Sequence, residues 1–122
     1  LAALTFALLL VSGCDGPVGA VDTENGVRAE ITASGLAIDN EKDEPIYVAA
    51  YGEWALIHVD PVPQTLQNPG RPIGSGERVV LPFQDDGLIR RADDRYSVDW
   101  LTIKGDPDNP HIGQRGTLEL RR

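Results

Sequence analysis

Strict alternation of apolar and polar residues, in short segments separated by glycine and proline, most limits what this chain can fold into. The longest such segment is residues 95–104 (RYSVDWLTIK), in which Tyr96, Val98 and Trp100 alternate with polar neighbours. Residues 27–33 (VRAEITA) alternate in the same way. A period of two residues is that of a β-strand with one buried face and one wet face. The pattern therefore predicts β structure.

Five further segments alternate or are rich in β-forming residues, and we expect them to be strands as well: residues 35–39, 46–51, 54–59, 77–83 and 117–121. In the segment 54–59 (WALIHV) the alternation places Trp54, Leu56 and His58 on one face. Turn-forming residues separate the segments. Six or seven short strands of this kind predict an all-β, antiparallel two-sheet sandwich over residues 27–122.

The first 14 residues carry no charged side chain, and residues 1–12 (LAALTFALLLVS) form a mostly apolar run. A membrane-spanning helix needs about 20 such residues, whereas the apolar region of a signal peptide has about 7–15. A buried core helix ending in a free cysteine is the alternative. It is disfavoured because the glycines and proline of residues 13–17 do not continue a helix.

The run ends in Val11-Ser12-Gly13-Cys14, an aliphatic residue and two small residues before a cysteine. This sequence resembles the lipobox of bacterial lipoprotein precursors. The resemblance implies cleavage between Gly13 and Cys14 and a lipid on the Cys14 thiol. Because mature lipoproteins carry more than one acyl chain, stable membrane anchoring would follow. The sequence does not begin with methionine, so we expect the start of the reading frame to lie upstream.

These features predict three parts: a signal peptide (residues 1–13), the lipidated cysteine with a flexible stalk (residues 14–26) and the sandwich (residues 27–122). The stalk prediction depends on three glycines, one proline and three acidic residues in residues 15–26, which show no periodicity. Asp15 resembles the residue that retains enterobacterial lipoproteins at the inner membrane. The expected location is the bacterial envelope, facing the periplasm or the exterior.

Residues 36–51 (LAIDNEKDEPIYVAAY) resemble a hairpin of immunoglobulin-like modules in bacterial envelope proteins. The resemblance extends over about 90 residues and implies an immunoglobulin-like sandwich. Together with the lipobox, it makes the chain similar to small envelope lipoproteins of a family without an assigned activity. The resemblance therefore implies a fold and a location, but no chemistry.

The charge of the chain argues against nucleic acid as a partner. The net charge is −8, and the basic residues are scattered apart from Arg90-Arg91 and Arg121-Arg122. An acidic surface repels the phosphates of nucleic acids. A single cysteine cannot form an intrachain disulfide or a cysteine-rich metal site.

No motif of the sequence predicts catalysis. The chain has two histidines, His58 and His111, and its serines lie outside any G-x-S-x-G motif. Ser75, between Gly74 and Gly76, is the serine most similar to that motif, and we interpret it as a turn residue. His58 is expected to be structural rather than a metal ligand. We therefore expect no enzymatic activity and no cofactor.

A binding role is the expectation that remains, and the connection at residues 60–76 (DPVPQTLQNPGRPIGSG) is the strongest candidate. Its expected contact residues are Pro61, Pro63, Pro69, Arg71 and Pro72. One alternative is an inhibitor of an envelope protease that uses this loop. Another is a calcium-stabilised domain, with Asp106 and Asp108 as the ligand candidates.

Overall fold

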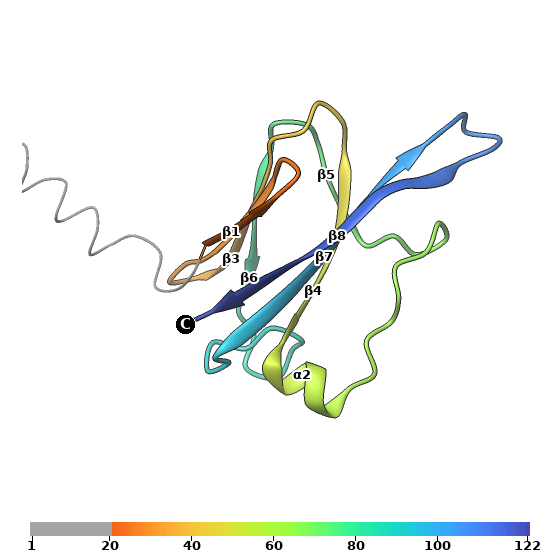
Figure 1. Ribbon diagram of the computed structural model, residues 1–122. Helices are drawn as coiled ribbons and strands as arrows, with labels where there is room; N and C mark the ends of the chain where they lie inside the picture. Colours follow the sequence, from red (N-terminus) through yellow and green to blue (C-terminus); the bar gives the residue numbers. More distant parts are fainter. Residues whose placement is uncertain (1–20) are drawn as a thin grey trace, which may run out of the picture.

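The computed structural model describes residues 21–122, which form two four-stranded antiparallel sheets packed against each other (Figure 1). One sheet has the order β1-β2-β3-β6 and the other β5-β4-β7-β8. The elements are β1 (Val21–Glu24), β2 (Val27–Ile31), β3 (Gly35–Asn40), β4 (Ile46–Gly52), α2 (Glu53–His58), β5 (Arg71–Ile73), β6 (Arg78–Pro82), β7 (Arg95–Lys104) and β8 (His111–Arg121). The predicted all-β sandwich is confirmed.

The chain crosses between the sheets three times, after β3, after β5 and after β6. Crossings of this kind are those of immunoglobulin-like sandwiches. Near the start of β7, the hydroxyl of Tyr96 donates a hydrogen bond to the backbone carbonyl of Arg90, six residues upstream. This is the tyrosine corner found in such folds. Connectivity and corner together agree with the immunoglobulin-like architecture.

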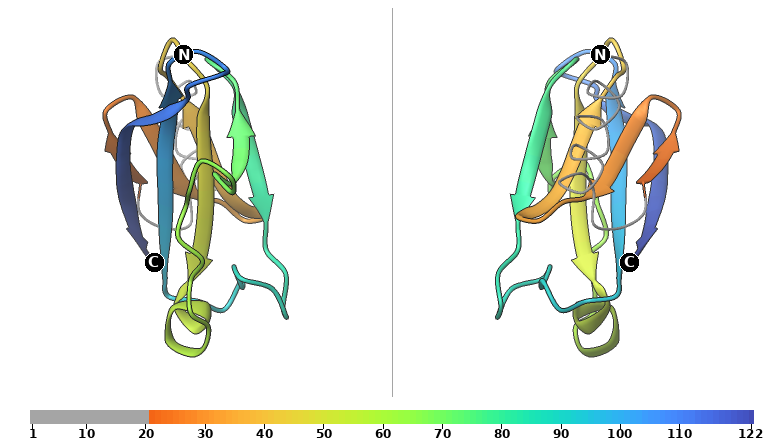
Figure 2. Two further views of the ribbon diagram at one scale, coloured as in Figure 1. Left: turned by 90° about the vertical axis from the view of Figure 1, so that its right-hand side faces the viewer. Right: turned by 90° about the vertical axis from the view of Figure 1, so that its left-hand side faces the viewer.

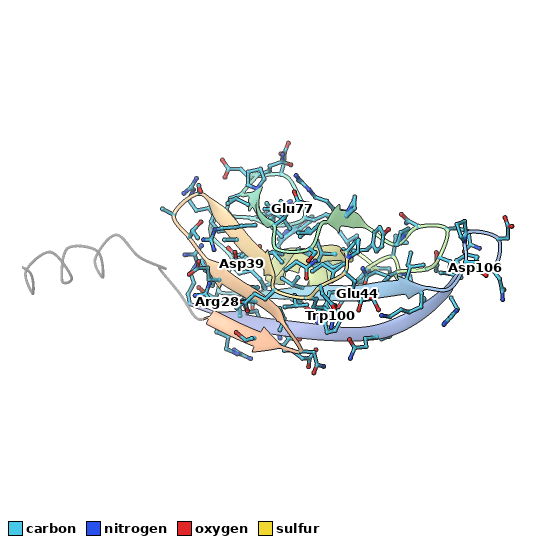
Figure 3. All side chains as sticks on the ribbon, turned by 90° about the horizontal axis from the view of Figure 1, so that it is seen from above. Arg28, Asp39, Glu44, Glu77, Trp100 and Asp106 are labelled. Atoms are coloured by element: carbon cyan, nitrogen blue, oxygen red, sulfur yellow. The ribbon has the colours of Figure 1, made fainter. Side chains whose placement is uncertain are left out.

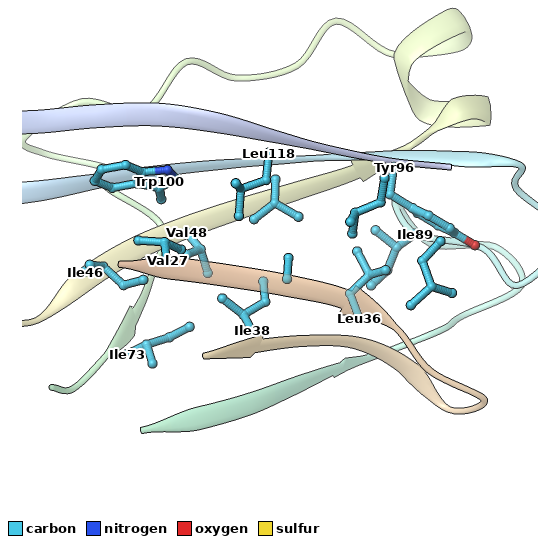
Figure 4. Close-up of a cluster of buried hydrophobic side chains, with 14 residues drawn as sticks. Val27, Leu36, Ile38, Ile46, Val48, Ile73, Ile89, Tyr96, Trp100 and Leu118 are labelled. Carbon is cyan, nitrogen blue, oxygen red and sulfur yellow. The ribbon is translucent and has the colours of Figure 1, made fainter. Parts of the chain in front are cut away.

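The core lies between the two sheets and takes side chains from both (Figure 4). Trp100 and Tyr96 are its largest fully buried members. They point inward from β7 together with Val98, as the alternation in the sequence predicts. From the other sheet the cluster receives Val27, Ala29, Ile31, Leu36 and Ile38.

Asn40, at the end of β3, fastens the two sheets to each other at one end of the sandwich. Its side chain is buried, and Nδ2 donates hydrogen bonds to three backbone carbonyls, those of Glu44, Ile73 and Gly74. Its Oδ1 accepts the backbone N–H of Lys42. A buried amide is costly unless its hydrogen bonds are made, so this position strongly favours asparagine.

The prediction of a strand at residues 54–59 is wrong, because residues 53–58 form the short helix α2. The contacts that favour the helix are tertiary. Asp93 accepts the N–H of Trp54, and the guanidinium of Arg90 lies 3.5 Å from the Trp54 ring centre. A helical turn also stacks Trp54 on His58. These contacts override the β propensity of the segment.

The prediction of a flexible stalk through residue 26 is wrong for residues 21–26. Val21–Glu24 pairs along its whole length with β2, and Asn25 and Gly26 form the turn, both with positive φ. The side chain of Glu24 also accepts a hydrogen bond from Trp100 Nε1 of the opposite sheet. The described fold therefore includes residues 21–26, which the prediction had placed outside it.

Two further boundaries differ from the prediction. The connection at residues 60–76 contains β5, a three-residue edge strand paired with β4. The last strand is longer than predicted, because β8 begins at His111 and pairs with β7 up to Lys104. The connection between the strands predicted at 95–104 and 117–121 is therefore a short hairpin turn at residues 105–110.

Candidate functional site

Residues 60–70, called the proline segment below, cross the outer face of the β5-β4-β7-β8 sheet (Figure 2). Side-chain hydrogen bonds hold the segment to β4. Gln64 Nε2 donates to the carbonyls of Tyr47, at 3.0 Å, and Pro69, at 2.6 Å. The Tyr51 hydroxyl donates to the carbonyl of Val62 at 3.3 Å. Two side-chain hydrogen bonds therefore join the segment to β4, one at Val62 and one at Gln64.

An apolar layer lies beneath the proline segment. The register pairs Tyr47 with Leu101, which puts both on the outer face, and Tyr51 lies on the same face of β4. Leu101 and Tyr51 are buried, yet neither belongs to the core between the sheets. Their burial must come from the outer side, where the proline segment crosses. The segment thus has a small hydrophobic layer of its own.

A hollow of about 260 Å³ opens beside the proline segment, over β7 and β8. Its lining residues are Pro63, Gln64, Asp99, Trp100, Arg115, Gly116 and Thr117. Asp99 and Thr117 are cross-strand partners on the outer face, and Arg115 lies on the same face two pairs further along, opposite Leu101. The hollow is the place where the proline segment and the outer face of the sheet come together.

The hollow contains charges of both signs. The Asp99 carboxylate accepts a hydrogen bond from Thr117 Oγ1 at 2.8 Å. No acidic side chain within residues 21–122 forms an ion pair with Arg115. A half-buried carboxylate, an unpaired guanidinium and the proline ring of Pro63 can together hold a polar extended segment.

The structure brings only one of the predicted contact residues to this hollow. Pro61 and Pro63 are exposed on the proline segment, and Pro69 is half-buried near its end. Arg71 and Pro72 lie in β5, which is an edge strand. Proline is tolerated in an edge strand because one side of the strand has no neighbour to which a backbone N–H must donate. Of the five, Pro63 alone lines the hollow.

Sequence reasoning missed Gln64, Asp99, Arg115 and Thr117 as lining residues. Alternation along residues 95–104 does place Asp99 opposite to the core-facing residues of β7. The register between β7 and β8, which brings Thr117 beside it, is set by tertiary pairing across the 105–110 turn. No local signal in residues 111–117 indicates that pairing.

The two histidines lie at opposite ends of the sandwich. His58 stacks on Trp54 at the end of α2, whereas His111 pairs with Lys104 beside the β7–β8 turn. The Ser75 hydroxyl donates to the carbonyl of Lys42. No group of three or more histidine, cysteine or acidic side chains within residues 21–122 is placed to hold a metal ion.

The candidate calcium ligands Asp106 and Asp108 lie in the exposed turn between β7 and β8. Figure 3 labels Asp106, at one end of the molecule. The turn closes through the backbone, where the N–H of Asn109 donates to the carbonyl of Asp106. The calcium hypothesis stays a prediction.

A cluster of four charged residues, Arg28, Glu30, Asp39 and Arg78, occupies the outer face of the other sheet; Figure 3 labels two of them. Arg78 contacts both carboxylates at 2.7 Å, and Arg28 contacts both at 3.2–3.4 Å. Hydrogen bonding from Arg78 is the largest cause that lowers the pKa of Glu30 below its ordinary value. The same hydrogen bond raises the pKa of Arg78. All four charges are paired, so this cluster is structural.

The predicted lipidation site lies outside the described residues, since Gly13 and Cys14 precede residue 21. Within the described part of the chain, no helix has the length and apolar character needed to cross a membrane.

Comparisons with protein-family models, with curated proteins and with solved structures gave no match for this chain.

Proposed function

We propose that this protein is a lipid-anchored component of the bacterial envelope whose sandwich domain binds a partner without catalysis. The sequence Val11-Ser12-Gly13-Cys14 supports the anchor. Val21 already belongs to β1, so at most residues 15–20 separate Cys14 from the sandwich. The partner is a protein or another envelope component with an extended polar segment.

The single observation that favours binding is the hollow beside the proline segment. The segment is fixed by hydrogen bonds of Gln64 and Tyr51, so its position is set before a ligand arrives. A preformed wall reduces the entropy lost on binding. Arg115 supplies a charge that no acidic side chain of residues 21–122 neutralises, and Asp99 supplies one of the opposite sign.

The anchor is tested by the intact mass of protein extracted from membranes. We expect loss of residues 1–13 and a gain of acyl mass on Cys14. The Cys14→Ala variant should be unacylated and released from the membrane fraction. A Cys14→Ala protein that stays acylated and membrane-bound would contradict the anchor.

The binding site is tested by photo-crosslinking in the native host. A photoreactive residue in place of Pro63, on the wall of the hollow, should capture a partner that mass spectrometry can identify. Val80 of β6, also exposed but on the other sheet, is the matched control position. Equal products from both positions, or none from Pro63, would remove the hollow as the binding site. Capture of a protease would favour the inhibitor hypothesis.

A further inference from the structure

The chain enters the sandwich at one end, called the proximal pole below. Val21 pairs with Glu30 near the end of β2, so the first described residue lies beside the turn between β2 and β3. The proximal pole comprises that turn (residues 32–34), α2, the connection at residues 83–94 and Arg121-Arg122. Backbone hydrogen bonds join these parts, among them Gly52 to Leu88 and Phe83 to Ser34. Figure 1 shows them at the same end.

The proximal pole exposes large apolar side chains. Ile57 is 65% exposed and Leu88 47%, and Trp54 and Val59 are each more than one-third exposed. Three of the four belong to α2 or its C-cap, and the backbone hydrogen bond from Gly52 to Leu88 places the fourth beside them. Six exposed large hydrophobic residues occur within the described chain, and four of them gather here. A gathering of this kind marks an interaction surface.

The cations of this acidic chain gather at the same pole. Five of the 11 basic residues lie there: Arg90, Arg91, Arg95, Arg121 and Arg122. Five acidic residues lie at the same pole, so its formal side-chain charge is zero, whereas the chain as a whole is acidic. Glu53 pairs with Arg95, and the buried Asp93 accepts backbone N–H groups, while Asp85, Asp86 and Asp94 are exposed.

The opposite end, the distal pole, is acidic. It comprises the turns at residues 41–45, 74–77 and 105–110. Its charged side chains are Glu41, Asp43, Glu44, Glu77, Asp106 and Asp108 against Lys42 and Lys104. An anionic membrane surface therefore repels the distal pole more strongly than the proximal pole.

We propose that the proximal pole rests on the phospholipid surface to which Cys14 attaches the chain, with Trp54, Ile57 and Leu88 in the headgroup region. This inference depends on the proposed lipid anchor. Six residues, 15–20, separate Cys14 from Val21. Even fully extended they span only about 20 Å, so the pole stays close to the lipid.

The side chains of the proximal pole are of kinds that favour a phospholipid surface. Tryptophan and arginine both combine an apolar body with a polar group, and both favour the interface between water and lipid. Arg91 and Arg122, which flank a hollow beside Phe83, can contact lipid phosphates. A contact between the proximal pole and lipid that is too weak to bind an unanchored protein is sufficient here. The lipid anchor raises the effective concentration of the pole at the membrane surface. The distal pole then faces away from the membrane.

The two tryptophans provide the test, because Trp54 is exposed at the proximal pole and Trp100 is fully buried. The acylated protein is placed in vesicles of phosphatidylethanolamine and phosphatidylglycerol, with or without bromine atoms on the acyl chains. Bromine quenches tryptophan only on close approach. In the Trp100→Phe variant, emission from Trp54 should fall about twofold on brominated vesicles, as for a side chain at the boundary between headgroups and acyl chains.

The Trp54→Phe variant is the matched control, and its Trp100 emission should not change. If Trp100→Phe does not fold, the quenching of the wild-type protein minus that of Trp54→Phe gives the same quantity. The Ile57→Ser and Leu88→Ser variants should reduce the quenching without releasing the protein from the vesicles.

The outcomes separate the two proposals. Acylated, vesicle-bound protein whose Trp54 is not quenched overturns the proximal contact and leaves the anchor standing. Protein that is not acylated in its host overturns the anchor, and the contact with it. A Trp54 emission shift that depends on protein concentration but not on bromine would show that a second copy covers the pole instead.

Discussion

The outer faces of the two sheets use charge in opposite ways. On the β1-β2-β3-β6 sheet, two arginines and two carboxylates pair with one another, and Glu30 is almost fully buried. On the β5-β4-β7-β8 sheet, the Asp99 carboxylate accepts a hydrogen bond from the hydroxyl of Thr117, and Arg115 has no acidic partner within residues 21–122. Each charge of the cluster on the first face has an oppositely charged partner, whereas the second face retains charges that a ligand can pair with.

This difference separates stabilising residues from binding residues. Removing one member of a closed, partly buried cluster leaves its partners unpaired, so it costs folding free energy. Removing a charge that has no partner costs the fold almost nothing. Substitutions on the first face should therefore affect unfolding, and substitutions at the hollow should affect binding alone.

The largest effect on stability is expected at the paired cluster. Glu30→Gln removes the charge that both Arg28 and Arg78 contact, and it should lower the free energy of unfolding by about 1–2 kcal/mol. Urea denaturation of the wild-type and variant proteins measures the difference. Val80→Thr, an exposed position in β6 of the same sheet, is the comparison variant. A Glu30→Gln protein as stable as wild type would show that the cluster contributes nothing.

The difference in unfolding free energy between the wild-type protein and Glu30→Gln should depend on pH, because it depends on the ionisation of Glu30. Arg78 lowers this pKa in the folded protein below the ordinary value of 4.5. The ionised carboxylate therefore stabilises the fold fully above pH 4.5, and the contribution is lost as the pH falls through the lowered pKa. Denaturation at neutral and strongly acidic pH should show the wild-type and Glu30→Gln stabilities converging on acidification. A gap that stays constant with pH would contradict this assignment.

A smaller effect is expected where the proline segment is attached. Gln64→Ala removes the hydrogen bonds to Tyr47 and Pro69 and should cost about 1 kcal/mol. Amide exchange in residues 60–70 should rise, while exchange in β7 stays slow. Gln67→Ala, an exposed position in the same segment, serves as the control. Unchanged exchange in the Gln64→Ala variant would mean that the apolar layer alone holds the segment.

The smallest effect on stability, with the largest effect on binding, is expected at the hollow. Asp99→Asn and Arg115→Ala should each change the free energy of unfolding by less than about 0.5 kcal/mol. Both should abolish capture of a partner by the photoreactive residue at position 63. If either variant unfolds readily, the hollow is a structural region and the contrast between the two faces fails.

The alternation in residues 95–104 was enough to predict both the extent of β7 and which of its residues face the core. It also predicted the class of the fold, because alternation with a period of two indicates a strand with one buried face. The same rule gave the wrong result at residues 54–59. There Asp93 and Arg90, more than 30 residues away in the sequence, stabilise a helical turn around Trp54.

The candidate site was less predictable than the fold. The proline content of residues 60–76 pointed to a segment of which Pro63 lines the hollow, and the binding role of that segment stays a prediction. Asp99, Arg115 and Thr117 come from two other strands, and only the β7–β8 register brings them together. Such a register depends on contacts across the whole sheet, so it cannot be predicted from the sequence of one short segment.

The sequence by itself determined the all-β class, the inward face of β7 and the acidic character of the chain, because each follows from local pattern or composition. The tertiary structure decided that residues 21–26 belong to the fold, that Trp54 lies on a helix, and that a carboxylate and a guanidinium line one hollow beside the proline segment. Each of these depends on pairing between segments distant in the chain, and the free energy of such pairing appears only when both partners are in place.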